Sequence, residues 1–102
     1  MSQTRSLYPY ISPLGLRYLV FVRKESYPNG EMRIQLYDSS DGMLYATATS
    51  QIQGKLEEGE VAIKDWSENE GILDFLIDYK FVEKPHRFVN QGFVKIPICK
   101  LI

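Results

Sequence analysis

The dipeptide Asn29-Gly30 is the feature that most constrains the fold of this chain. Both residues tolerate positive φ, and Asn-Gly between two β-type runs is the strongest short-range signal for a hairpin. Residues 16–24, before it, are β-branched or aromatic on both alternating faces, which predicts a central strand buried at least partly on both sides. Residues 32–37, after it, alternate aliphatic with polar or aromatic side chains. The chain is therefore expected to build an antiparallel sheet around this hairpin.

Further strands are expected before and after a single helix. Residues 44–49 repeat the alternation, so a three-stranded meander is predicted around the hairpin. A short strand is expected at residues 61–63, and a C-terminal hairpin should end in a last strand over residues 93–98. Because Pro97 lacks an amide donor, that strand is expected at an edge of the sheet or with its residue-97 side unpaired.

One segment has a clear helical pattern. Ser67 and Glu70 have capping-box spacing, in which the hydroxyl accepts from the Glu70 amide and the carboxylate reaches back, so the helix is expected to begin at residue 68 and to span about 68–79. Its apolar stripe consists of Ile72, Phe75, Leu76 and Tyr79, widened by Leu73. The stripe is expected to pack on one face of the sheet.

These elements predict an α+β domain with a mainly antiparallel sheet of five to six strands and the helix packed on one face. The competing architecture is a small half-open barrel closed by the last strand. Residues 1–15, which carry two prolines and a glycine, are expected to form an extended N-terminal arm, and residues 16–102 the single α+β domain. An exposed edge at the arm or at the last strand could pair with a second copy of the chain, which makes a homodimer possible.

Length and composition narrow the class of protein. The 102 residues, 44% of them hydrophobic, suit one globular domain that needs neither a metal nor a disulfide for its core. Cys99 is the single cysteine, and the N-terminal residues have no apolar signal segment, which predicts a cytoplasmic protein. The longest apolar run, residues 18–22, is far too short for a membrane span, so no membrane association is expected.

The charges are segregated along the chain. Residues 1–36 carry a net charge of +3, residues 37–78 of −8 and residues 79–102 of +4. The acidic part contains a helical stripe without intervening bases, which could be a docking face for a basic partner or a solvated surface. The residues expected to bind a partner are Trp66, Glu68, Glu70, Asp74 and Asp78.

The opposite face of the sheet predicts a second kind of site. Aromatic side chains mixed with cations are typical of a platform for single-stranded nucleic acid, where bases stack and phosphates pair with the cations. An isoelectric point near 5.8 speaks against this interpretation. Cross-strand pairs that only stabilise the sheet are the alternative. The residues expected on this face are Arg17, Arg23, Arg33, Tyr37, Tyr45, Thr47 and Lys95.

Signals for catalysis are weak. His86 is the single histidine, and the chain has no phosphate loop, nucleophile elbow or metal-spaced set of Cys and His. A calcium loop starting at Asp65 fails because its sixth position is Glu70 and its twelfth is Leu76. Cys99 is expected to be a packing residue. No enzymatic activity, cofactor or metal site is therefore expected.

Several strings of the sequence occur together in a recognisable pattern: Asn29-Gly30, Lys64 to Gly71, Arg87 to Val89, Gly92-Phe93 and Pro97 to Leu101. With these strings the chain, and its C-terminal third above all, resembles a family of small uncharacterised proteins common in bacterial genomes and on phages and plasmids. Where that pattern has a glycine after the helix, this chain has Tyr79-Lys80. The resemblance implies a mobile-element context and no activity that can be assigned to a residue. The expected function is a non-enzymatic protein-binding module, in that context an inhibitor or modulator of a host defence or regulatory protein; the alternative is nucleic-acid binding.

Overall fold

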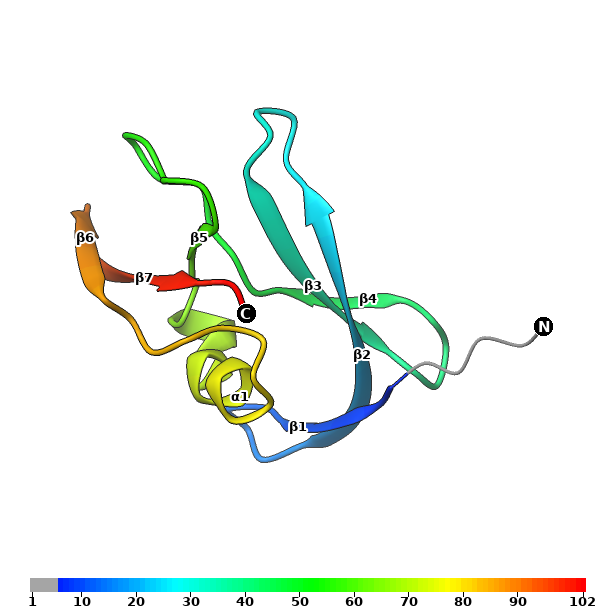
Figure 1. Ribbon diagram of the computed structural model, residues 1–102. Helices are drawn as coiled ribbons and strands as arrows, with labels where there is room; N and C mark the ends of the chain where they lie inside the picture. Colours follow the sequence, from blue (N-terminus) through cyan, green and yellow to red (C-terminus); the bar gives the residue numbers. More distant parts are fainter. Residues whose placement is uncertain (1–5) are drawn as a thin grey trace.

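The computed structural model describes residues 6–102, which form seven strands, one 3-10 turn and one short α-helix (Figure 1). Their bounds are β1 (Tyr8–Ile11), β2 (Arg17–Ser26), β3 (Met32–Asp38), β4 (Leu44–Thr47), β5 (Glu60–Ala62), the turn η1 (Ser67–Asn69), α1 (Ile72–Asp78), β6 (Arg87–Gln91) and β7 (Val94–Lys100). Residues 6–102 contain no helix that is long and apolar enough to cross a membrane.

The strands form two antiparallel sheets, one in the order β1-β2-β3-β4 and one in the order β5-β7-β6. The α+β class and the antiparallel pairing are thus confirmed, whereas the single sheet of five to six strands is wrong. Among residues 6–102, backbone pairing joins the two sheets at one corner, where Thr49 and Ile63 form an isolated bridge. Next to it, the Ser50 amide donates to the Ala62 carbonyl at 2.9 Å. Beyond this corner the two sheets separate to enclose the core.

The predicted meander is formed by β2, β3 and β4, and the Asn29-Gly30 turn connects the first two of them. A register shift interrupts the β3–β4 pairing, because Leu36 faces Ala46 whereas Tyr37 faces Leu44. Tyr45 is the extra residue on β4. Its side chain packs against the core, which its place in the plain alternation did not predict.

Part of the expected N-terminal arm belongs to the sheet. Residues 8–11 are extended, as predicted, but they form β1, and Tyr10 is buried with 2% of its surface exposed. Pro9 is tolerated because β1 is an edge strand. Its partner Leu19 directs its carbonyl to the Ser39 amide on the β3 side, so the missing donor of Pro9 faces the free edge. Residues 1–5 of the arm lie outside the described residues.

The last strand is central rather than at an edge, because β7 pairs with β5 on one side and β6 on the other. Pro97 lies just beyond the last β5 pair, Ala62 with Ile98, so its missing amide interrupts no ladder bond. Its carbonyl accepts from the Ile63 amide at 3.0 Å. The half-open barrel closed by the last strand is not formed by the described residues.

The helix is shorter than predicted, and the capping box is not formed. Gly71 precedes α1 with φ +94°, a conformation that separates η1 from the helix. The cap comes from Asp65, whose Oδ1 accepts from the amides of Gly71 and Leu73, both at 3.0 Å. The helix therefore begins at Ile72, and Tyr79 lies just beyond its end.

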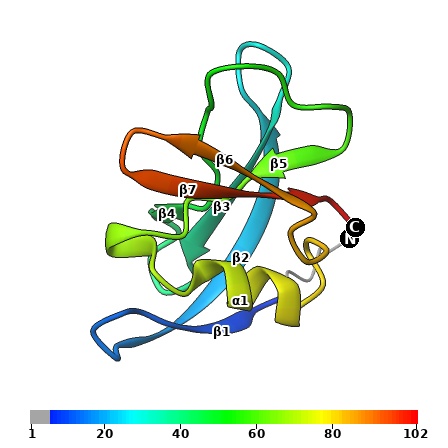
Figure 2. The ribbon, with the colours of Figure 1, turned by 90° about the vertical axis from the view of Figure 1, so that its left-hand side faces the viewer.

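Most apolar side chains belong to one core between the two sheets. α1 lies between β1 and the three-stranded sheet (Figures 1 and 2) and inserts Ile72, Phe75 and Leu76. Phe75 meets the ring of Tyr10 edge-on at 5.2 Å. A smaller cluster lies on the other face of β5 and β7. Its buried members are Ala62, Ile96 and Ile98, covered by Ile52, Leu56, Trp66, Val89 and Val94.

Candidate functional site

The face of the β1–β4 sheet that is turned away from the core exposes several aliphatic side chains. We call this surface the outer face. Ile11, Leu19 and Leu44 are 58%, 52% and 51% exposed there. The other residues of the outer face are Pro9, Arg17, Phe21, Arg23, Glu25, Arg33, Gln35, Tyr37 and Thr47. Exposed apolar side chains that share one face mark an interaction site more often than an isolated surface leucine does.

Strand alternation and register create the outer face. Val20 and Val22 of β2 point into the core, so Leu19 and Phe21 point the other way. The register then aligns Phe21 with Tyr37 and Tyr37 with Leu44 across three strands. The rings of Phe21 and Tyr37 stack with 5.2 Å between their centroids. This row gives the outer face an aromatic centre, in which Phe21 is largely covered, with 6% of its surface exposed.

Glu25 neutralises part of the positive charge on this face. It accepts from Arg33 Nη2 at 3.0 Å and from the Tyr37 hydroxyl at 2.8 Å. The hydrogen bond from Tyr37, followed by that from Arg33, lowers the pKa of the Glu25 carboxyl. Arg33 and Tyr37 are therefore engaged within the sheet.

Arg17 and Arg23 remain exposed and form no ion pair in residues 6–102. The Arg23 guanidinium lies over the Tyr37 ring, 5.8 Å from its centroid. Arg17 borders a hollow of about 530 Å³ together with Leu19 and the turn at residues 38–40. The outer face thus combines aliphatic side chains with two free cations.

The predicted nucleic-acid residues do not all share this face. Arg17, Arg23, Arg33 and Tyr37 do, and so does Thr47, whose hydroxyl donates to Gln35. Tyr45 instead contacts Tyr10 and Tyr18 on the core side, because of the register shift in β4. Lys95 lies on β7 of the other sheet, over the ring of Phe88 at 4.8 Å.

The predicted acidic docking face is also divided. Trp66 packs on the smaller cluster. Glu68 pairs with Lys64 at 2.5 Å, and this contact is the main reason why its pKa falls to about 2. Glu70 precedes α1, and only Asp74 and Asp78 are exposed on the helix itself. These acidic side chains therefore do not form one continuous helical stripe.

Glu60 is the most buried charged side chain among the described residues, with 3% of its side chain exposed. Arg87 donates to it twice, at 2.7 and 3.1 Å, and the Glu57 amide donates at 2.9 Å. His86 Nε2 lies 2.5 Å from Glu60 Oε2, the oxygen that also accepts from Arg87 Nε. The bonds from Arg87 are the largest cause of a Glu60 pKa lowered to about 2. No local sequence pattern predicts this cluster, because His86 and Arg87 lie 26 and 27 residues from Glu60.

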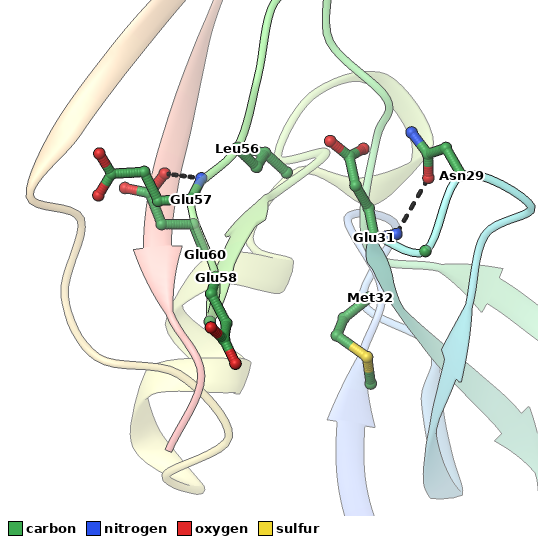
Figure 3. A pocket seen from close by; sticks show the side chains of 9 residues that line it. Asn29, Glu31, Met32, Leu56, Glu57, Glu58 and Glu60 are labelled. Carbon is green, nitrogen blue, oxygen red and sulfur yellow. Dashed lines mark hydrogen bonds between the residues drawn. The ribbon is translucent and has the colours of Figure 1, made fainter.

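A cleft of about 600 Å³ lies beside Glu60, between residues 29–32 and residues 56–60 (Figure 3). Figure 3 shows Glu31 on one wall and Glu57 and Glu58 on the other. Paired carboxylates can perform acid and base chemistry when one of them has a raised pKa. Glu60 has the opposite shift and its oxygens are occupied by Arg87, His86 and Glu57. Its arrangement is that of a structural ion pair.

Comparisons with known proteins found no match to this chain among family models, curated proteins or solved structures.

Ile11, Leu19 and Leu44 were not among the predicted site residues. The strand at residues 16–24 is central and partly buried on both faces, as predicted, because Phe21 is 6% exposed on the outward face, but Leu19 on that same face is half exposed. A signal for this was present, because Arg17 and Arg23 share the strand parity of Leu19 and Phe21. Two arginines on one face of a strand indicate that this face meets water or a partner.

Proposed function

We propose that this protein is a non-enzymatic protein-binding module and that its outer face makes the contact. The observation that supports the proposal is the set of exposed aliphatic side chains Ile11, Leu19 and Leu44 around the stacked Phe21 and Tyr37. Interfaces bury such residues at their centre and keep polar groups at the rim, and Arg17 and Arg23 fit that rim. In the mobile-element context that the sequence resemblance implies, the partner would be a host defence or regulatory protein.

The acidic helix supports this function less well than the outer face does. Asp74 and Asp78 are exposed, but Trp66 packs on the smaller cluster and Glu68 forms an ion pair with Lys64.

Nucleic-acid binding is also less well supported than protein binding by the outer face. Glu25 places a carboxylate among the arginines of the outer face and engages the Tyr37 hydroxyl. An ordered stacking platform would need free aromatic faces there.

The experiment is affinity capture from the source cells, followed by titration of the purified partner against defined variants. Leu19→Ser removes an exposed apolar side chain from the outer face, and Phe93→Ser is the matched control on the β6–β7 hairpin. We expect Leu19→Ser to weaken binding at least about tenfold, which corresponds to about 1.4 kcal/mol, and Phe93→Ser to leave it unchanged. If wild type and Leu19→Ser bind the partner with equal affinity, the outer face is not the binding surface. Loss of binding only in Asp74→Asn/Asp78→Asn would assign the contact to the helix.

A further inference from the structure

The outer face carries an unbalanced positive charge. Glu25 and Arg33 cancel each other through their ion pair, whereas Arg17 and Arg23 have no carboxylate partner within residues 6–102. Asp38 borders the hollow next to Arg17 and keeps its negative charge, because the amide and hydroxyl of Ser40 donate to its Oδ1 at 2.9 and 2.7 Å and lower its pKa, but it forms no ion pair with Arg17. A covering partner would therefore meet two free guanidinium groups.

The two cations are separated by one exposed apolar side chain, Leu19, and by Phe21, which is largely covered. Arg17, Leu19, Phe21 and Arg23 follow one another on the same face of β2. Six strand residues at about 3.3 Å each put Arg17 and Arg23 about 20 Å apart. Between them, Leu19 is half exposed, and Ile11 and Leu44 extend the apolar surface to either side. A complementary ligand needs carboxylates at two places about that far apart, with apolar side chains between them.

Each of the two arginines, Arg17 and Arg23, has a defined structural surrounding. The Arg23 guanidinium is held over the Tyr37 ring, which limits its freedom and lowers the entropy that binding would cost. Arg17 stands at the border of the 530 Å³ hollow, which is large enough for a carboxylate side chain. Charge complementarity over such a surface sets the orientation and the rate of association.

We propose that the ligand of the outer face is an acidic and apolar segment of a protein, whose carboxylates bind Arg17 and Arg23 and whose aliphatic side chains cover Leu19. This inference rests on the proposed function and specifies the chemistry of the partner. A protein is favoured over nucleic acid because, among the described residues, the outer face has two cations without an ion-pair partner, whereas nucleic-acid binding usually neutralises several phosphates. It is also favoured over an anionic membrane, since stable membrane attachment requires a denser basic patch.

The test is selection from a random peptide library displayed on phage, with the full-length protein as bait. Selected peptides are then synthesised, and their Kd values are measured by fluorescence anisotropy. We expect the peptides to be rich in Asp and Glu together with Leu, Ile or Phe. Their affinity should fall about tenfold in Arg17→Gln/Arg23→Gln, and the salt dependence of binding should flatten. Lys95→Gln removes an exposed cation outside the outer face and should change neither quantity.

The outcomes separate the inference from the proposed function. Selected peptides that are apolar without an acidic excess, or that bind Arg17→Gln/Arg23→Gln as tightly as wild type, overturn the inference but keep the binding face. If no selected peptide loses affinity in Leu19→Ser, both proposals fail. Tighter binding of oligothymidine or of phosphatidylserine vesicles than of the acidic peptides overturns the inference in favour of those ligands. Thermal melts of each variant confirm that these surface changes leave the fold intact.

Discussion

Glu60 and Arg87 form a two-point ion pair that fastens the start of β5 to the start of β6, although neither strand pairs with the other. Both strands instead pair with β7, which lies between them. Replacing Glu60 by Gln keeps the shape of the side chain but removes the charge that Arg87 and His86 contact. We expect the free energy of unfolding to fall by about 1.5 to 3 kcal/mol, as for other hydrogen bonds to charged groups. Urea unfolding of Glu60→Gln, with the exposed Glu58→Gln as control, measures this; equal midpoints would contradict it.

The same carboxyl should make stability depend on acid pH. The Glu60 pKa is lowered from 4.5 to about 2 in the folded protein. A depressed pKa stabilises the fold fully above the unfolded value, and this contribution is lost as pH falls from about 4.5 towards 2. The difference in Tm between wild type and Glu60→Gln should therefore be largest at neutral pH and should shrink over that window. A difference that stays constant down to pH 2 would show that Glu60 acts through packing rather than through its charge.

Asp65 should contribute more to the helix than the capping-box residues do. Its Oδ1 accepts from two amides at the beginning of α1, whereas the Glu70 side chain has no such bond. Asp65→Ala is expected to cost about 0.5 to 2 kcal/mol, the range measured for lost N-caps, and Glu70→Ala close to nothing. Chemical denaturation of the two variants separates these values. A larger loss of unfolding free energy in Glu70→Ala than in Asp65→Ala would show that the capping box, and not Asp65, caps the helix.

Lys80 should be a site where one substitution stabilises the protein. It follows α1 with φ +62°, and the Phe81 amide donates to the Leu76 carbonyl at 2.8 Å while the Lys80 amide donates to that of Ile77. These bonds form a Schellman motif, whose left-handed position favours glycine. Lys80→Gly removes backbone strain and should raise the free energy of unfolding by up to about 1 kcal/mol, net of the entropy of glycine. Lys84→Gly, at an exposed position without positive φ, should not raise the melting temperature.

Cys99 should be unreactive while the protein is folded. It is fully buried in β7, and desolvation raises the pKa of its thiol to about 11. Since the thiolate is the reactive form, iodoacetamide at pH 8 should label Cys99 only through unfolding. Mass spectrometry should show labelling in denaturant and little in buffer. Rapid labelling of the native protein would mean that β7 opens locally.

The parts of the fold that were predictable depend on neighbours in the sequence. Asn29-Gly30 and the alternation on both sides of it predict the β2–β3–β4 meander because each hairpin needs only local turn chemistry. The division into two sheets was not predictable in this way, because it depends on pairing between distant segments: β5 pairs with β7 and not with the first sheet, to which it is joined by the bridge between Thr49 and Ile63. The helix start was mispredicted because Ser67 and Glu70 matched a local rule, while the actual cap, Asp65, acts six and eight residues away across a left-handed Gly71.

The candidate site was predictable only in part. The alternation placed Arg17, Arg23, Arg33 and Tyr37 on one face, and the structure has them there. It failed at Tyr45, because a one-residue register shift reverses the side to which a β residue points. The neutralising role of Glu25 also depends on cross-strand partners, which a single strand does not reveal.

The pairing of β5 with β7 gives the molecule a vectorial order of assembly. Residues 60–62 pair with residues 98–100, so α1 and β6 lie in the chain between the two strands. On a ribosome the β1–β4 sheet can form early, whereas β5 cannot pair until residues 98–100 have left the exit tunnel. Closure of this long loop should set the folding rate, because non-local pairing must overcome its entropy before contacts compensate for it. Until β7 arrives, the inner face of the first sheet and Val61 stay open to water, and the nascent chain then has its greatest tendency to aggregate.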